Sequence, residues 1–210
     1  TGKVDFREAQ EIIESLTNND VNEYSNLDIH RRERTGIPEV IFADGKTPAQ
    51  VAGIFQRLVS DDFGVLATRV TPAMYLEIMD MLPDAEYSAE THLLFSRPKN
   101  LVKKSPGIAV VTAGTSDIPV AEEAAVTAEM MGHDVQRIFD VGVAGVHRLF
   151  NRLDDLRKAN VVIVAAGMEG ALPSVIGGLI SAPIIALPTS VGYGASFGGL
   201  AALLGMLNSC

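Results

Sequence analysis

One carboxylate of this sequence lies between two glycines, in the segment Gly167-Met168-Glu169-Gly170. The segment follows NVVIVAAG, a continuous apolar run that is typical of a strand buried on both faces. A carboxylate in an apolar site holds a proton more tightly, which suits it to general-base catalysis, and we therefore predict that Glu169 is a catalytic base. The alternative is that its charge only favours the start of the following helix.

A second segment, Gly114-Thr115-Ser116-Asp117, follows the apolar run IAVVTA. Its backbone N–H groups and hydroxyls precede a predicted helix with Pro119 in the first turn, and the N-terminus of a helix attracts anions. The segment is therefore predicted to bind a phosphate group. An equally simple interpretation is that Ser116 or Asp117 only caps the helix.

Two further segments follow the remaining apolar runs. The first contains Asp140, His147 and Arg148, whose charges could hold a phosphate or a carboxylate. A His-Arg pair early in a helix is, however, more often only solvated or packed. The second segment, residues 188–199, is so rich in glycine that its backbone is expected to come close to a ligand or to a neighbouring subunit.

The single cysteine, Cys210, is the last residue of the sequence. A lone cysteine near the end of an apolar helix is usually a small buried hydrophobic residue, so its position alone does not predict a nucleophile. The sequence contains no His, Cys or carboxylate spacing typical of zinc or iron, no Walker lysine motif and no GxGxxG after a strand. No bound structural metal is therefore predicted.

These segments need a scaffold that brings them together. From about Gly107 onward, an apolar run and a helix pattern alternate four times, in residues 108–132, 134–159, 160–180 and 182–207. Repetition of strand, loop and helix predicts a parallel sheet with helices on both faces. Ligands bind beyond the carboxyl ends of such strands, so the four loops are expected to form one site.

The first half of the chain has a different pattern. Residues 6–16 and the charged segment 30–36 indicate a peripheral helical arm. Residues 39–59 and 64–82 each indicate a strand, a turn and a helix that is capped by a threonine before a proline. The short strand THLLFS is expected to close this small α/β unit, and the basic segment that follows is expected to be a linker.

The sequence thus predicts two domains. Residues 1–104 would form the helical arm and the small α/β domain, and residues 105–210 would form the α/β catalytic domain. The sequence begins without Met and stops at Cys210 directly after an apolar helix pattern. We expect the natural protein to extend beyond both ends, so that the second domain is truncated at its C-terminus.

The composition favours a globular protein with a small-molecule ligand. Of 210 residues, 47% are hydrophobic and 20% are charged, and the formal net charge is −9 at pH 7. This charge repels phosphate backbones and anionic lipid, so neither nucleic acid nor a membrane surface is expected as a partner. The most apolar stretch, residues 160–207, is broken by prolines and glycines before it reaches the ~20 apolar residues that span a bilayer.

The start of the sequence has neither the positive region nor the apolar region of a signal peptide. A single cysteine allows no internal disulfide. We therefore expect a cytoplasmic protein.

Three motifs taken together resemble a known family. GTSD, AGVHR and AAGMEGALPSVIGGL are similar to the loops GSxSD, SAHR and GAGGAAHLPG of the aminoimidazole ribonucleotide carboxylase/mutase (PurE) family of purine synthesis. That family handles carbon dioxide, and its subunits form an octamer. Ala171 stands where its members have a histidine, which argues against the purine reaction for this chain.

Longer motifs resemble the LarB family of nickel-pincer nucleotide (lactate racemase cofactor) biosynthesis along essentially the whole chain. These motifs are LDIHRRERTGIPEVIFADGKTPAQ, GMEGALPSV and GYGASFGGLAALLGMLNSC. The resemblance implies an enzyme that carboxylates the pyridinium ring of nicotinic acid adenine dinucleotide and hydrolyses its phosphoanhydride. The products would be pyridinium-3,5-biscarboxylic acid mononucleotide and AMP.

The same resemblance implies what the reaction needs. Carbon dioxide would be a substrate, magnesium would assist hydrolysis, and no organic prosthetic group would take part. A homo-octamer is carried over from the family, and Gly- and Ala-rich helices such as GGLAALLGML would give it packing surface.

A cationic pyridinium ring does not attack carbon dioxide unless it is first made electron-rich. The resemblance assigns this step to Cys210, whose thiolate would add at ring carbon 4 and make carbon 5 nucleophilic. After carboxylation Glu169 would remove the proton from carbon 5, so that the thiolate can leave. The positive ring would itself favour the thiolate form of the cysteine.

The other site residues are assigned to substrate binding. The GTSD segment and the His147-Arg148 pair would hold phosphate or carboxylate groups, and the last loop would shape the pocket of the ring. The assigned residues are Gly114, Thr115, Ser116, Asp117, Asp140, His147, Arg148, Gly167, Met168, Gly170, Thr189, Ser190, Gly192 and Tyr193.

Two other functions fit the sequence less well. One is a diverged aminoimidazole ribonucleotide carboxylase/mutase, and the other is a non-catalytic nucleotide-binding protein in which Cys210 and Glu169 have no role. A basic cluster in the first domain also stays open to interpretation as a solvated face, an oligomer contact or a clamp for the adenylate phosphate. Its members are Arg31, Arg32, Arg34 and Lys46.

Overall fold

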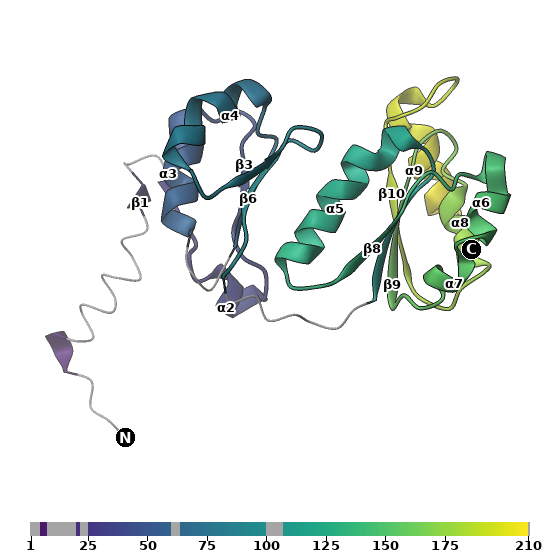
Figure 1. Ribbon diagram of the computed structural model, residues 1–210, viewed down its shortest axis with the longest axis horizontal. Helices are drawn as coiled ribbons and strands as arrows, with labels where there is room; N and C mark the ends of the chain where they lie inside the picture. The colour runs from purple at the N-terminus through teal and green to yellow at the C-terminus, as the bar shows by residue number, and fades with distance from the viewer. Residues whose placement is uncertain (1–4, 8–19, 22–24, 60–63, 100–106, 210) are drawn as a thin grey trace. The chain divides into compact units, whose positions relative to one another are not determined.

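The chain folds into two compact units, Thr1–Leu101 and Val102–Cys210 (Figure 1). The structure is a computed structural model that describes residues 5–7, 20–21, 25–59, 64–99 and 107–209. The domain boundary expected between residues 104 and 105 lies outside the described residues, and so does most of the helix expected in residues 6–16.

The first unit contains a mixed sheet with the strand order β3-β4-β6-β5. β3 pairs parallel with β4, whereas β6 runs antiparallel to both β4 and β5. The strands are β3 (Val40–Phe42), β4 (Val65–Thr68), β5 (Glu86–Ser88) and β6 (Leu93–Ser96). A small antiparallel pair precedes the sheet, made of β1 (Asp20–Val21) and β2 (Ser25–Asn26).

Helices cover one face of this sheet, as Figure 1 shows for α3 (Pro48–Leu58) and α4 (Pro72–Ile78). Each begins as the sequence predicts: the hydroxyl of Thr47 or Thr71 accepts a hydrogen bond from a backbone N–H in the first turn, and a proline follows. The remaining helical segments are α2 (Arg31–Thr35) and η1 (Met79–Met81). The buried core between helices and sheet includes Ile41, Phe55, Val65, Ile78 and Leu94.

The expected strand within residues 91–96 is present as β6. Sequence analysis missed its hairpin partner, β5. β5 is short, and its residues are exposed or half-buried, so it lacks the apolar run that marks a buried strand.

The second unit contains a four-stranded sheet in which every pairing is parallel, with the order β10-β9-β7-β8. The predicted parallel sheet is therefore confirmed. Its strands are β7 (Ile108–Thr112), β8 (Val135–Ile138), β9 (Val161–Ala166) and β10 (Ile184–Pro188).

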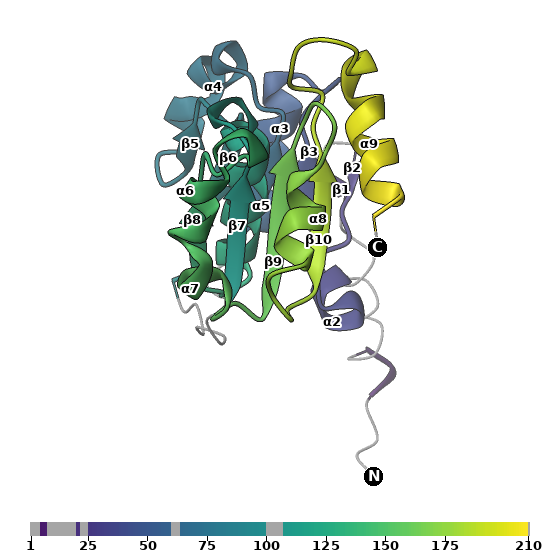
Figure 2. The same cartoon turned by 90° about the vertical axis from the view of Figure 1, so that its right-hand side faces the viewer.

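Figure 1 shows α5 (Ile118–Met130) on one face of this sheet, and α6 (Val146–Phe150), α7 (Leu153–Leu156) and α8 (Leu172–Gly177) on the other. Side chains of the central strands point to the two faces in turn. Val110 and Ala165 pack with α5, whereas Val111 and Val164 pack with α6, α7 and α8. Figure 2 shows α9 beside β10 at the edge of the sheet.

The helices of this unit are shorter than the sequence patterns predict. The pattern in residues 144–159 is divided into η3 (Val143–Gly145), α6 (Val146–Phe150) and α7 (Leu153–Leu156), because Gly145 and Arg152 have non-helical dihedral angles. α8 (Leu172–Gly177) ends before the pattern does. The last pattern is divided into η4 (Phe197–Gly199) and α9 (Leu200–Leu207), because Gly198 and Gly199 have positive φ.

No helix in the described part of the chain is both long enough and apolar enough to cross a membrane.

Candidate active site

A cavity of about 430 Å³ lies at the carboxyl ends of the parallel strands of the second unit. Its lining comes from the loops after β7, β8, β9 and β10, so the expected convergence of the four loops on one site is observed. The volume lies within the range of roughly 300–1,000 Å³ that is common for small-molecule sites.

Most of the predicted site residues line this cavity. Those that do are Gly114, Thr115, Ser116, Asp117, Asp140, Arg148, Gly167, Met168, Glu169, Gly192 and Tyr193. His147, Gly170, Thr189 and Ser190 are not part of the lining. Cys210 lies outside the described residues.

In the loop after β7, Asp117 is an anchor rather than a free ligand. It is only 4% exposed, and its two carboxylate oxygens accept hydrogen bonds from different loops. The backbone N–H of Gly114 donates to one oxygen at 2.9 Å, and the hydroxyl of Thr189 donates to the other at 2.7 Å. This buried bridge fixes the β7 and β10 loops to each other. Thr189 therefore does not line the cavity but holds Asp117, which does.

Thr115 and Ser116 are exposed in the same loop. They belong to the 3-10 turn η2 (Thr115–Asp117), which leads directly into α5, and the first turn of α5 has no hydrogen bond from a side-chain cap. A helix start without such a cap keeps backbone donors and a partial positive charge available to an anion. The hydroxyls and the helix start together suit a phosphate or carboxylate group.

In the loop after β8, Asp140 and Arg148 form an ion pair with an Nη1–Oδ2 distance of 2.5 Å. Asp140 has a φ of 57°, a left-handed conformation that is uncommon for a residue other than glycine. The guanidinium of Arg148 lies against Gly145, where an added Cβ would be only 2.7 Å from Nε. His147 is exposed on the same helix but does not reach the cavity.

In the loop after β9, Glu169 lines the cavity with an exposed side chain. The sequence predicted a buried carboxylate, and this part of the prediction is wrong for the single chain. The neighbouring Met168 has a φ of 52°. Like Asp140, it is a residue of the lining that has a left-handed conformation although it is not a glycine. Such conformations cost free energy and are concentrated at functional sites.

The glycines of the β9 and β10 loops allow the loops to touch each other. A Cβ on Gly167 would lie 1.8 Å from the carbonyl oxygen of Val191, and one on Gly192 would lie 2.7 Å from Cγ of Met168. A Cβ on Gly170 would lie 2.7 Å from the carbonyl oxygen of Ala202 in α9. The close approach of a backbone that we expected for the β10 loop is present within the chain, where Gly192 lies against Met168 of the β9 loop.

Apolar residues complete the lining of the cavity, and apart from Ala171 they were not singled out from the sequence. They include Val143, Ala166, Ala171 and Leu172. Ala171 keeps space free at the position where the PurE motif has a histidine, and it leaves Glu169 as the side chain of this loop that can exchange a proton.

The described residues contain no group of three or more His, Cys, Asp and Glu side chains that could hold a metal ion. Around the cavity, Asp117 is buried in its two hydrogen bonds and Asp140 is paired with Arg148. Magnesium usually keeps several waters and binds one or two carboxylates together with phosphates of the substrate.

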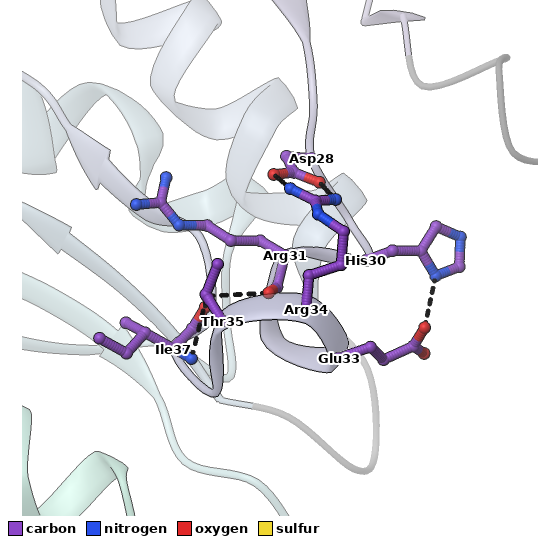
Figure 3. A network of polar contacts seen from close by, with 7 residues as sticks. All are labelled: Asp28, His30, Arg31, Glu33, Arg34, Thr35 and Ile37. Atoms are coloured by element: carbon purple, nitrogen blue, oxygen red, sulfur yellow. Dashed lines mark hydrogen bonds and ion pairs between the residues drawn. The ribbon is translucent and has the colours of Figure 1, made fainter.

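The basic cluster of the first unit is partly neutralised (Figure 3). Arg34 donates two hydrogen bonds to the carboxylate of Asp28, at 2.7 and 2.6 Å, and they lower the pKa of Asp28 below its usual value. Lys46 donates to the carbonyl oxygen of Phe42. Arg32 instead lines a separate cavity of about 360 Å³ with Arg57. Of the four side chains of the cluster, Arg32 alone is part of the lining of this cavity.

Comparison with known proteins gives both halves a family. Residues 18–98 match the LarB/PurE-like N-terminal domain, and residues 107–210 match the AIR carboxylase domain.

Two proteins of Methanocaldococcus jannaschii are similar to the chain. One, an uncharacterized protein, is 39% identical over all of this chain and 84% of its own length. The other is an N5-carboxyaminoimidazole ribonucleotide mutase, 33% identical over 46% of this chain and 59% of its own length.

Proposed function

The chain belongs to the family that joins a LarB/PurE-like N-terminal domain to an AIR carboxylase domain, and we propose that it carboxylates the pyridinium ring of nicotinic acid adenine dinucleotide. In this proposal it also hydrolyses the phosphoanhydride of that dinucleotide. The products are pyridinium-3,5-biscarboxylic acid mononucleotide and AMP, for nickel-pincer nucleotide synthesis.

The observation that carries the proposal is the meeting of three kinds of group in one cavity. The start of α5 and the Arg148 guanidinium suit anionic groups, Glu169 suits proton removal, and apolar residues such as Leu172 suit an aromatic ring. A pyridinium dinucleotide presents these features: phosphates, a ring carboxylate and a planar ring.

Carboxylation begins with the Cys210 thiolate, the role that the LarB resemblance gives to this residue. The thiolate adds to carbon 4 of the cationic ring, and the electron pair that neutralises the ring makes carbon 5 nucleophilic. Carbon 5 then forms a bond to carbon dioxide. Glu169 accepts the proton from carbon 5, the ring regains its aromaticity and positive charge, and the carbon–sulfur bond breaks to release the thiolate.

Exposure of Glu169 in the single chain suits a base that must deliver its proton to solvent after each turnover. Its position is nevertheless restrained by its backbone. A Cβ on Gly205 would lie 2.3 Å from the carbonyl oxygen of Glu169, so α9 lies directly against this residue. The helix can therefore hold the carboxylate at the cavity without burying it.

Hydrolysis of the phosphoanhydride adds one water molecule across the bond between the two phosphates. The backbone donors at Thr115 and Ser116 and the guanidinium of Arg148 would hold the phosphates and disperse their negative charge. Magnesium on the diphosphate would neutralise further charge, and Asp140 and Glu169 are the carboxylates of the lining that could enter its coordination shell.

A homo-oligomer, with the octamer as the expected size, is part of the proposal. Leucines on the outer side of α9 are 41–72% exposed, and β10, at the edge of the sheet, exposes Ile185. A surface of this kind is usually covered by another protein surface. The proposal places the enzyme in the cytoplasm, where dinucleotides and magnesium are available.

The alternative is an aminoimidazole ribonucleotide carboxylase/mutase, which the second relative and the AIR carboxylase match favour. The matched N-terminal domain and Ala171 in place of the motif histidine argue for the pyridinium substrate instead.

The test incubates the protein with nicotinic acid adenine dinucleotide, ¹³C-bicarbonate and magnesium, followed by mass spectrometry. We expect AMP and a mononucleotide that carries one labelled carboxyl group. Glu169→Gln should lower the rate by roughly 10²–10⁴-fold, and Cys210→Ala should abolish labelling. Glu90→Gln, in the other unit, is a matched control that should keep the full rate. Unchanged dinucleotide with the wild-type protein would overturn the proposal, and aminoimidazole ribonucleotide would then be tested.

A further inference from the structure

Thr112 is a buried polar residue in β7, whose other residues are apolar. It is the last residue of β7 and is fully buried. Its Oγ1 accepts a hydrogen bond from the backbone N–H of Asp140 at 3.0 Å. Its carbonyl oxygen accepts a second one from Val141 at 3.1 Å. Two acceptors of one residue therefore hold the first turn of the β8 loop.

These bonds hold a backbone that would otherwise relax. Asp140 has a φ of 57°, and a left-handed conformation is unfavourable for a residue with a Cβ. The bond to Oγ1 satisfies the N–H group of this strained residue. With the backbone fixed in this way, the carboxylate of Asp140 meets Nη1 of Arg148.

The far end of this chain of contacts is the Arg148 guanidinium, which lines the cavity. A guanidinium has five N–H donors, and the bond to Asp140 uses one of them. Gly145 leaves room for the group beside the backbone, since a Cβ there would be 2.7 Å from Nε and 3.1 Å from Nη2. The guanidinium is thus held at Nη1 by Asp140 and packs against Gly145.

We propose that Thr112 is a positioning residue, which acts through Asp140 to aim the Arg148 guanidinium at an anionic group of the substrate. A valine at this position would fill the same buried volume, so packing of the core does not require the hydroxyl. The identification of the anion as a phosphate or carboxylate of the dinucleotide rests on the proposed function. The contacts from Thr112 to Arg148 do not depend on it.

The first experiment is a double-mutant cycle read by calorimetric binding of nicotinic acid adenine dinucleotide. Thr112→Val should weaken binding by about tenfold, which corresponds to about 1.4 kcal/mol. Thr112→Ser keeps the hydroxyl and should restore most of the affinity. If Thr112 acts through Arg148, Thr112→Val should have no further effect in an Arg148→Gln background. Equal tenfold losses in both backgrounds would overturn the inference.

A second measurement tests the positioning without any ligand. The Nε–Hε NMR signal of Arg148 should shift and broaden in Thr112→Val, and it should keep its wild-type position in Thr112→Ser. Thr127→Val is the control, because the hydroxyl of Thr127 bonds only within α5 and does not line the cavity. An unchanged Arg148 signal in folded Thr112→Val would overturn the inference.

The two measurements separate the inference from the proposed function. A dinucleotide that does not bind to the wild-type protein, together with a shifted Arg148 signal, would overturn the proposed function and support the positioning role. A dinucleotide that binds to the wild-type protein, together with an unchanged Arg148 signal in Thr112→Val, would support the proposed function and overturn the positioning role.

Discussion

The two units start their helices in the same way in sequence but not in structure. α3 and α4 in the first unit and α5 and α8 in the second all have a proline in the first turn. In the first unit a threonine hydroxyl caps each of the two helices, whereas neither α5 nor α8 has a side-chain cap. Capped starts serve stability, and the uncapped starts lie at the cavity, where a ligand can use their donors.

The loops of the two units also differ in how closely other atoms pack around their glycines. In the first unit, a Cβ on Gly45 would meet nothing within 4 Å. In the second unit, Gly142 and Gly167 pack so tightly that a Cβ would collide with the backbone of another loop. The unit that carries the cavity therefore depends more on contacts between its loops.

Among the variants that test this difference between the units, Gly167→Ala is expected to have the largest effect on stability and binding. Its Cβ would lie 1.8 Å from the carbonyl oxygen of Val191, so the β9 and β10 loops must separate. Overpacking of this kind costs roughly 3 kcal/mol. We expect lower stability of the second unit in urea unfolding and loss of dinucleotide binding.

Gly178→Ala is the matched control, because its Cβ would lie 3.6 Å from the carbonyl oxygen of Val175, an ordinary contact. It should leave both properties unchanged. Wild-type stability of Gly167→Ala would contradict the close packing of the two loops.

A pair of smaller changes sharpens the comparison of the helix starts. Thr47→Ala removes the cap of α3 and should cost about 1 kcal/mol of folding free energy, with no change in dinucleotide affinity. Ser116→Ala lies at an uncapped start and should change stability by less than about 0.5 kcal/mol while it weakens binding.

Urea unfolding and calorimetry of both variants measure these effects. The account fails if Thr47→Ala weakens binding as much as Ser116→Ala does.

The smallest expected effect concerns α2, where structure is held by exposed charges. Hydrogen bonds from Arg34 lower the pKa of Asp28, so the contribution of this pair is present above the unfolded value of about 3.9 and is lost as the pH falls below it. An NMR titration of the Asp28 carboxyl group should give a lower midpoint than in Arg34→Gln. Equal midpoints would show that the pair is not formed in solution.

The sheet and the place of the cavity could be predicted from sequence because both depend on local patterns. Continuous apolar runs mark buried parallel strands, and the loops after such strands must meet at one edge. Eleven of the residues assigned to the site line the cavity. They are Gly114, Thr115, Ser116, Asp117, Asp140, Arg148, Gly167, Met168, Glu169, Gly192 and Tyr193.

What the sequence could not predict depends on partners far along the chain. Thr112 looks like one more residue of an apolar strand, and only its bond to Asp140 reveals a role. Asp117 has its partner 72 residues away in Thr189. The exposure of Glu169 depends on where α9 lies, which no local pattern encodes.

The dinucleotide is expected to bind at the loops of the second unit that line the cavity, beside the uncapped starts of α5 and α8. The most direct test is to record backbone amide NMR shifts during titration with nicotinic acid adenine dinucleotide and magnesium. The account predicts the largest shifts at Thr115, Ser116, Asp140 and Glu169. Shifts confined to α2 and the cavity of the first unit, or no shifts at saturating ligand, would contradict it.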